Sequence, residues 1–357
     1  MAHLLQRWLN KYLADPEAVT LAILLLLGFA LVTLLGDILA PVLAGIVIAY
    51  LLEDVVEIMV HHGVRRRWAV LFVYSLFITL LLLTLLVLVP LLSQQLGQLL
   101  QELPAMVAKG QMVLMQLPHA YPQLITEEHL REIMINVRAD LAHQGEALLT
   151  LSLASITTLF AVMIYLVLLP LLVFFFLKDK EPLLQWLGSY LPRERHVALR
   201  VWQELDRQIG NYIRGKSIEI VVVGVVSWLA FTVLGLNYAS LLGALMGLSV
   251  LVPYIGAVVV TVPVLVIGYF QWGYGDAFIA LIAVYLIIQT LDGSVLVPLL
   301  FSEVVNLHPV AIIVAILVFG GIWGFWGVFF AIPLATLVKA VMDAWPCVND
   351  EKRAATG

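Results

Sequence analysis

The sequence predicts an all-α polytopic integral membrane protein. Of its 357 residues, 62% are hydrophobic and only 12% are charged, and the mean hydropathy is +1.03. Soluble globular chains carry about 45–50% apolar and about 25% charged residues, so an excess of this size cannot be buried in a soluble core. Apolar runs near the ~20 residues needed to cross a bilayer recur along the chain. Six to eight membrane helices are expected.

The first 90 residues are predicted to form membrane helices with the N-terminus in the cytoplasm. Residues 1–14 fit an amphipathic helix on the membrane surface. Asp15-Pro16-Glu17 then has the composition of a helix start. Three consecutive arginines at 65–67 mark a cytoplasmic loop, since basic residues concentrate on that side. The expected spans are 18–35, 38–60 and 68–89, the last ending at Pro90.

The rest of the chain divides by composition into five further segments. Residues 91–150 are acidic and carry leucines at helical spacing, which predicts an amphipathic periplasmic segment of short helices. Its helices are expected to be separated at Pro104, Pro118 and Pro122. A membrane helix at 151–177 precedes a basic cytoplasmic amphipathic segment at 178–216. An apolar segment at 217–345 and a cytoplasmic tail at 346–357 complete the chain.

The basic residues also predict the orientation. Sixteen of the 19 lysines and arginines fall in segments assigned to the inside, so both termini are expected in the cytoplasm. The single cysteine, Cys347, excludes an internal disulfide framework and a four-cysteine metal site.

The stretch 217–338 contains no lysine or arginine and is interrupted twice. Pro253-Tyr254-Ile255-Gly256 breaks one apolar run, and Gly320-Gly321 with Gly324 breaks another. As one helix, residues 237–270 would measure about 50 Å, too long for a straight crossing of a ~30 Å core. Each broken run is either a kinked span, giving eight spans, or a re-entrant hairpin, leaving six. Short arms and breaks rich in glycine or proline favour hairpins.

Residues 210–217, GNYIRGKS, satisfy the pattern of a nucleotide-binding P-loop. That pattern binds phosphate only between a strand and a helix, where backbone amides can surround the phosphates. Here an amphipathic helix is predicted before the motif and a membrane span after it. The motif is therefore interpreted as part of a basic juxtamembrane collar, and ATP-driven transport is not expected.

Three acids, Glu219, Asp292 and Glu303, lie at or near membrane depth in the stretch without basic residues. A carboxylate buried without a cation partner is costly, so it takes up a proton or meets a cation, as a coupling site for H⁺ or Na⁺ requires. The alternative for Glu219 and Glu303 is headgroup water at the ends of spans. Asp292 lies in the middle of its run and is the preferred coupling acid. Hydrogen bonds are expected from Gln289, Asn306 and His308.

The two breaks supply the candidate hairpin tips or gates, namely Pro253, Tyr254, Gly256, Gly320, Gly321, Gly324 and Pro333. The glycines could equally form a close helix-packing face. Pro333 frees a carbonyl that lines a path or only kinks a helix. His61-His62 lacks spaced partners for a metal site. Catalytic residues, a metal and a cofactor are not expected, so the chain is not expected to be an enzyme.

Several short motifs resemble the autoinducer-2 exporter family. They are Leu169-Pro170 with residues 174–180 (FFFLKDK), 212–216 (YIRGK), 252–256 (VPYIG), 306–309 (NLHP) and 331–335 (AIPLA). The resemblance implies a bacterial inner-membrane transporter that forms a homo-oligomer, such as a pentamer or another ring. The family includes exporters of a small polar signalling molecule and proteins proposed to exchange Na⁺ for H⁺.

The leading hypothesis is therefore a secondary transporter, an exporter or antiporter with 217–345 as its transport core. Its expected partners are a small polar solute, H⁺ or Na⁺, and the lipid bilayer, without nucleic acid. A membrane scaffold that moves nothing and a passive channel are the alternatives.

Overall fold

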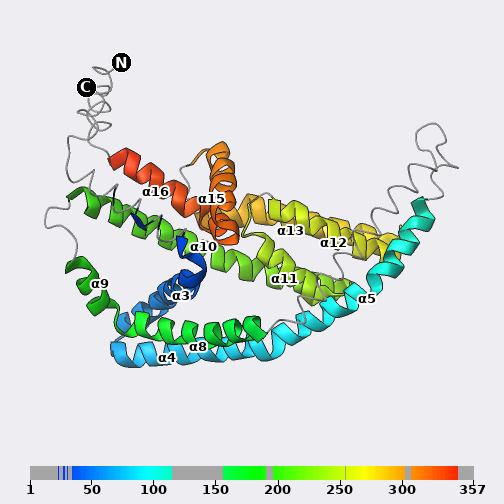
Figure 1. Ribbon diagram of the computed structural model, residues 1–357. Helices are drawn as coiled ribbons and strands as arrows, with labels where there is room; N and C mark the ends of the chain where they lie inside the picture. Colours follow the sequence, from blue (N-terminus) through cyan, green and yellow to red (C-terminus); the bar gives the residue numbers. More distant parts are fainter. Residues whose placement is uncertain are drawn as a thin grey trace, which may run out of the picture.

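The computed structural model is built from helices (Figure 1). It describes residues 23, 27–28, 30, 34–114, 156–189, 196–253, 255–301 and 307–344, and these contain no strand. The expected amphipathic helix at 1–14, most of the first span, Pro118, Pro122 and the C-terminal tail lie outside the described residues. So do three candidate site residues, Tyr254, Glu303 and Asn306.

Three helices pack into an N-terminal group. They are α3 (Gly36–His61), α4 (Arg66–Leu83) and α8 (Ile156–Lys178), and the short α9 (Lys180–Ser189) follows α8. Figure 1 shows α4 and α8 running alongside each other below α3. Val56, Val73 and Val173 are buried where the three helices meet. The span expected at 38–60 thus corresponds to α3. The described part of the span expected at 151–177 is α8.

The predicted helix end at Pro90 is wrong. A π-helix, η1 (Thr84–Leu88), continues α4 directly into α5 (Val89–Leu114), and Pro104 also lies inside α5. Proline cannot donate to the carbonyl four residues earlier and its ring crowds that carbonyl. The wider π-turn before Pro90 relieves this conflict without ending the helix. The long helix therefore carries the chain well past the expected boundary at residue 90 (Figure 1).

One helix, α10 (His196–Leu234), runs through the centre of the molecule. Its 39 residues measure about 58 Å at 1.5 Å per residue. The basic amphipathic helix and the span expected after it are thus a single helix, with no break near residue 217. GNYIRGKS lies entirely within α10, which excludes the P-loop backbone and agrees with the interpretation against ATP binding.

Helix α11 (Ala239–Ser249) packs back against α10 through glycines. A Cβ on Gly247 would lie 2.6 Å from the Ile220 carbonyl oxygen and 3.0 Å from the Gly224 Cα atom. A Cβ on Gly243 would lie 2.8 Å from the Trp228 Cα atom. The absence of these side chains lets the two backbones approach closely, as in small-residue packing of membrane helices.

The break near Pro253 forms a helix hairpin. After α11 the chain turns through residues 250–253, and α12 (Ile255–Trp272) follows. Gln271, at the end of α12, accepts from the Asn237 amide at 2.8 Å and donates to the Gly235 carbonyl at 2.7 Å, so the far ends of the two arms meet. With 11 and 18 residues at 1.5 Å per residue, the arms measure about 16 Å and about 27 Å, so only the first is as short as expected.

The next membrane element is irregular at its centre. Helix α13 (Asp276–Leu291) passes through a π-helix, η2 (Asp292–Leu296), into α14 (Val297–Phe301). Pro298 follows η2 as Pro90 follows η1, and the same conflict with an earlier carbonyl explains the widened turn. Asp292 therefore lies at the first residue of a local defect in its helix.

The second break is at Gly324, inside α15 (Pro309–Phe329), where φ is 58° and ψ is −134°. L side chains rarely adopt this region, so glycine is required there. A Cβ on Gly327 would overlap the Phe319 carbonyl, which shows how tightly the chain folds back. Helix α16 (Ala331–Ala344) follows and packs on α15 (Figure 1).

These helices confirm the predicted fold class. Within the part of the chain that the structure describes, five helices are long and apolar enough to cross a membrane, and three shorter apolar helices accompany them. The protein is a multi-pass, all-α membrane protein with two broken elements in its C-terminal half.

Candidate functional site

A buried ion pair lies near the middle of α10. Lys216 Nζ donates to Glu219 Oε2 at 2.7 Å, and only 7% and 3% of the two side-chain surfaces are exposed. The residues are one helical turn apart, so they share a face of α10. Removing either partner would leave the other charge without compensation in a dry environment.

Lys216 also connects α10 to two other elements. Its Nζ donates to the Val250 carbonyl at 2.6 Å, at the C-terminal end of α11 and directly before the hairpin tip. The negative end of the α11 dipole favours a cation there. The same Nζ lies 5.4 Å from the centroid of the Phe301 ring of α14, within cation–π range.

Asp292 adds a second carboxylate to this group. It lies within electrostatic range of Lys216 and Glu219. Its Oδ1 atom is buried and has no hydrogen-bond partner. A buried oxygen without a partner loses its interaction with water and gains nothing in return. We call Lys216, Glu219 and Asp292 the charge cluster.

The expectation that these acids lack a cation partner is wrong for Glu219. Its partner is Lys216, the last basic residue before the stretch without lysine or arginine. Headgroup water is also not the environment of Glu219, because the residue is 2% exposed within the protein. The cluster still has two carboxylates for one ammonium. The coupling hypothesis depends on a carboxylate without its own cation, and that carboxylate is Asp292.

Gln289 belongs to a neighbouring polar network between α12 and α13. Its Nε2 donates to the Tyr285 hydroxyl at 3.1 Å, and that hydroxyl donates to the Ala257 carbonyl at 3.0 Å. Thr261 Oγ1 is 2.5 Å from the same hydroxyl. Gln289 lies one turn before Asp292 on α13, but its side chain bonds to Tyr285.

The other described candidates have local structural roles. His308 is the N-cap of α15, and its Nδ1 accepts from the Val310 amide at 3.3 Å. Pro333 is buried in the first turn of α16, where its missing N–H leaves no hydrogen bond unmade. Pro253 lies in the first hairpin tip, and a Cβ on Gly256 would overlap the Ser249 carbonyl. Gly320 and Gly324 shape the second break, whereas no atom lies within 4 Å of a Cβ on Gly321.

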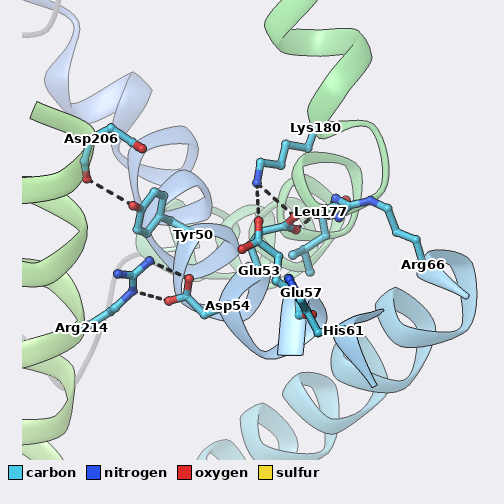
Figure 2. A network of polar contacts seen from close by, with 10 residues as sticks. All are labelled: Tyr50, Glu53, Asp54, Glu57, His61, Arg66, Leu177, Lys180, Asp206 and Arg214. Carbon is cyan, nitrogen blue, oxygen red and sulfur yellow. Dashed lines mark hydrogen bonds and ion pairs between the residues drawn. The ribbon is translucent and has the colours of Figure 1, made fainter. Parts of the chain in front are cut away.

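A second polar group joins the N-terminal helices to α10, a few residues before Lys216 (Figure 2). Arg214 Nη2 donates to Asp54 Oδ1 of α3 at 2.6 Å, and Nε donates to Oδ2. Tyr50 places its ring 5.4 Å from the Arg214 guanidinium, and its hydroxyl donates to the Asp206 carbonyl at 3.3 Å. Gly210 lies directly against this ring, which leaves no space for a Cβ. We call these contacts the α3–α10 joint.

Glu53 and Glu57 of α3 bind the other N-terminal elements. Glu53, 6% exposed, accepts from Arg66 of α4 at 2.8 and 3.2 Å and from Lys180 of α9 at 3.1 Å. Lys180 also donates to Glu57 at 3.2 Å (Figure 2). Burial lowers the pKa of Lys180, but the hydrogen bonds and charges of Glu53 and Glu57 outweigh this effect and raise the pKa. Lys180 therefore stays charged at neutral pH.

Comparison with known proteins identifies the family. The sequence matches the AI-2E family transporter model over residues 20–347. The chain belongs to the AI-2E transporter family. It is 48% identical to PerM of Escherichia coli (strain K12) over 346 residues, which cover 97% of this chain and 98% of PerM. It is 25% identical to the AI-2 transport protein TqsA of the same strain, over 90% of this chain and 92% of TqsA.

The stretch 212–216, one of the motifs that resemble the family, makes contacts in several directions. Tyr212 donates to the Phe329 carbonyl at 3.3 Å, Arg214 binds Asp54, and Lys216 binds Glu219 and Val250. Gly215 lies against the Phe301 ring, because a Cβ added to it would be only 2.7 Å from Cε1 of that ring. Five consecutive residues of α10 thus connect four other parts of this AI-2E protein. Composition alone assigned Lys216 and Arg214 to a basic collar, although the Lys216–Glu219 spacing of one turn was a visible signal.

The α3–α10 joint of this AI-2E protein is testable by a double-mutant cycle. Asp54→Asn and Arg214→Gln each remove one partner of a charge-assisted, bidentate contact. We expect a coupling energy of about 0.5–2 kcal/mol in thermal unfolding of the detergent-purified protein. Asp54→Asn combined with Arg66→Gln is the matched control, since Arg66 binds Glu53 instead. Additive effects in the first cycle would show that the joint contributes nothing.

Proposed function

We propose that the protein is a secondary transporter that exports a small polar solute and couples this flux to H⁺ or Na⁺ at the charge cluster. The observation that carries the proposal is the buried, partnerless oxygen of Asp292 beside a buried Lys216–Glu219 pair. An ionisable group placed at membrane depth is costly and typically serves transport. The AI-2E family description supports the transporter class.

The surrounding geometry supports the same proposal. The cluster lies at the tip of the first hairpin, through Val250, and beside the second broken element, through Phe301, which packs with Ile316 and Ala331. Interrupted helices at membrane depth are tolerated where protein or water satisfies the freed backbone groups, and transporters build binding sites from them. Ser227, two turns beyond Glu219 on the same face of α10, adds a buried hydroxyl without a partner.

The proposed setting is the bacterial inner membrane, with both termini in the cytoplasm and several copies forming a ring. One related protein is named for AI-2 transport, which makes AI-2 one candidate cargo. A proton entering across about 100 mV supplies roughly 2.3 kcal/mol, enough for a modest solute gradient.

Asp292→Asn is expected to abolish gradient-dependent flux, because an amide can neither take up a proton nor carry a charge. The measurement uses purified protein in liposomes, with AI-2 and other small polar solutes tested with and without an imposed H⁺ or Na⁺ gradient. Asp276→Asn is the matched control, since Asp276 is an exposed acid in the first turn of the same helix.

Unchanged flux in Asp292→Asn would remove the residue from the mechanism. Ion current without solute coupling would instead favour a passive channel, and no flux under any gradient would favour a scaffold.

A further inference from the structure

The charge cluster already contains its own cation. Lys216 Nζ is within 2.7 Å of both Glu219 Oε2 and the Val250 carbonyl. These oxygens are the ligands that a hard metal cation would need, because such ions take several oxygen ligands at short distance. A sodium ion would have to displace the ammonium or lie beside it, where like charges repel strongly because the surroundings are buried. A proton also meets the charge of Lys216, but it needs only one carboxylate oxygen, such as the partnerless Oδ1 of Asp292.

Asp292 is the group that remains for that proton. Within the described residues, the charged groups close enough to act on it electrostatically are Lys216 and Glu219 of α10. Tyr212, one turn earlier, faces Glu219, while Tyr285 of α13 is hydrogen-bonded to Ala257. The other elements present the Val250 carbonyl and the Phe301 ring. Asp292 is near enough for its charge to act on Lys216, but the ammonium is hydrogen-bonded to Glu219 and to the Val250 carbonyl.

We propose that the cluster takes a proton and not a metal cation, and that Lys216 is the latch through which this proton controls the tip of the first hairpin. With Asp292 protonated, the cluster holds one positive and one negative charge, and Lys216 stays on Glu219 and the Val250 carbonyl. Loss of the proton leaves a second carboxylate that draws the ammonium away from Val250. The hairpin tip then loses a contact with α10 and opens more easily.

This inference rests on the proposed role of Asp292 as the coupling acid and adds the identity of the ion. It also assigns a positioning role to Lys216, which acts on the hairpin through a backbone carbonyl. The tip can shift while α11 stays packed on α10, because the turn has its own hydrogen bonds, from the Val252 amide to the Ser249 carbonyl at 3.1 Å and from the Gly256 amide to the Val252 carbonyl at 2.9 Å.

The test follows access to the tip. In a Cys347→Ser background, which removes the single native cysteine, Val252→Cys reports on the hairpin tip. Tyr274→Cys, in the turn after α12, is the reference because Tyr274 is 89% exposed. Both proteins are placed in phosphatidylethanolamine–phosphatidylglycerol vesicles and labelled with N-ethylmaleimide over about three pH units. The ratio of the two labelling rates removes the pH dependence that the two thiols share, and Asp292→Asn shows whatever difference between the thiols remains.

The ratio is expected to rise with pH, by up to about tenfold per pH unit for a single titrating group, and to be the same in sodium chloride and choline chloride. In Asp292→Asn the ratio should stay low at every pH, because the latch remains closed. In Lys216→Met it should stay high at every pH. Asp276→Asn should behave as the parent protein does.

A pH-independent ratio in the parent protein, or one that changes when choline replaces sodium, would overturn the inference. If Lys216→Met does not fold, the flat, low ratio of Asp292→Asn still decides the question. The labelling experiment tests the latch, and the flux experiment tests transport. A tip whose labelling depends on pH, without coupled flux, would support the latch and reject the proposed transport. Coupled flux with a pH-independent tip would do the reverse.

Discussion

Lys216→Met is expected to destabilise the protein by about 3–5 kcal/mol, because it leaves a buried carboxylate without its partner. Glu219 is 2% exposed, and water cannot reach it to replace the ammonium. The substitution keeps most of the side-chain volume, so the loss reports on charge and not on packing. The measurement is the midpoint of thermal or denaturant unfolding of the detergent-purified protein.

The rescue variant separates charge from other effects. Lys216→Met combined with Glu219→Leu removes both charges, and replacing a buried ion pair by apolar residues of similar volume is often neutral or stabilising. Most of the lost stability should therefore return. Arg214→Met is a comparison for a more exposed pair, with side-chain exposures of 40% and 31%, and should cost less. A single Lys216→Met variant as stable as the parent would show that the ion pair is unimportant.

Gly256→Ala is expected to distort the first hairpin and to cost about 1–3 kcal/mol, because one added methyl group must displace backbone. A Cβ on Gly256 would overlap the Ser249 carbonyl oxygen, which the short turn holds in place. The displaced tip would also move Val250 away from Lys216, so flux should fall together with stability. Both quantities are measurable on the same purified sample.

Gly97→Ala provides the matched substitution. No atom lies within 4 Å of a Cβ at this helical position, so the change should stabilise the protein by up to about 1 kcal/mol. If Gly256→Ala matched Gly97→Ala in both unfolding and flux, the hairpin tip would not need the close approach seen in the structure.

Hydropathy and chain breakers predicted most of the fold. The apolar runs located α3, α8 and α13, and the prolines and glycines located both broken elements, because these residues act through their own backbone geometry. Pro90 and Pro104 were wrongly interpreted as helix ends. Proline ends a helix when its ring clashes with the carbonyl four residues earlier. The wider π-turn at 84–88 relieves this clash before Pro90, so the helix continues.

The site was only partly predictable. Glu219 and Asp292 were singled out because carboxylates are rare in apolar runs, and the structure brings them together around Lys216. The role of Lys216 was missed because this residue ends the basic segment and was grouped with the cytoplasmic residues. The helix continues past that change in composition, so Lys216 lies inside α10 beside Glu219. The Asp54–Arg214 contact joins residues 160 positions apart, and no local pattern specifies such a partner.

The continuity of α10 has a consequence for the evolution of this chain. Its hydrogen bonds to Asp54 of α3, to the Phe329 carbonyl of the second broken element and to the Val250 carbonyl of the first hairpin all come from residues 212–216, on different sides of one rigid helix. Each residue advances the helix by about 100°. A single inserted or deleted residue in this part of α10 would rotate every later side chain of the helix away from its partner. Side-chain identities here can drift among descendants, but the number of residues between Tyr212 and Glu219 should not change.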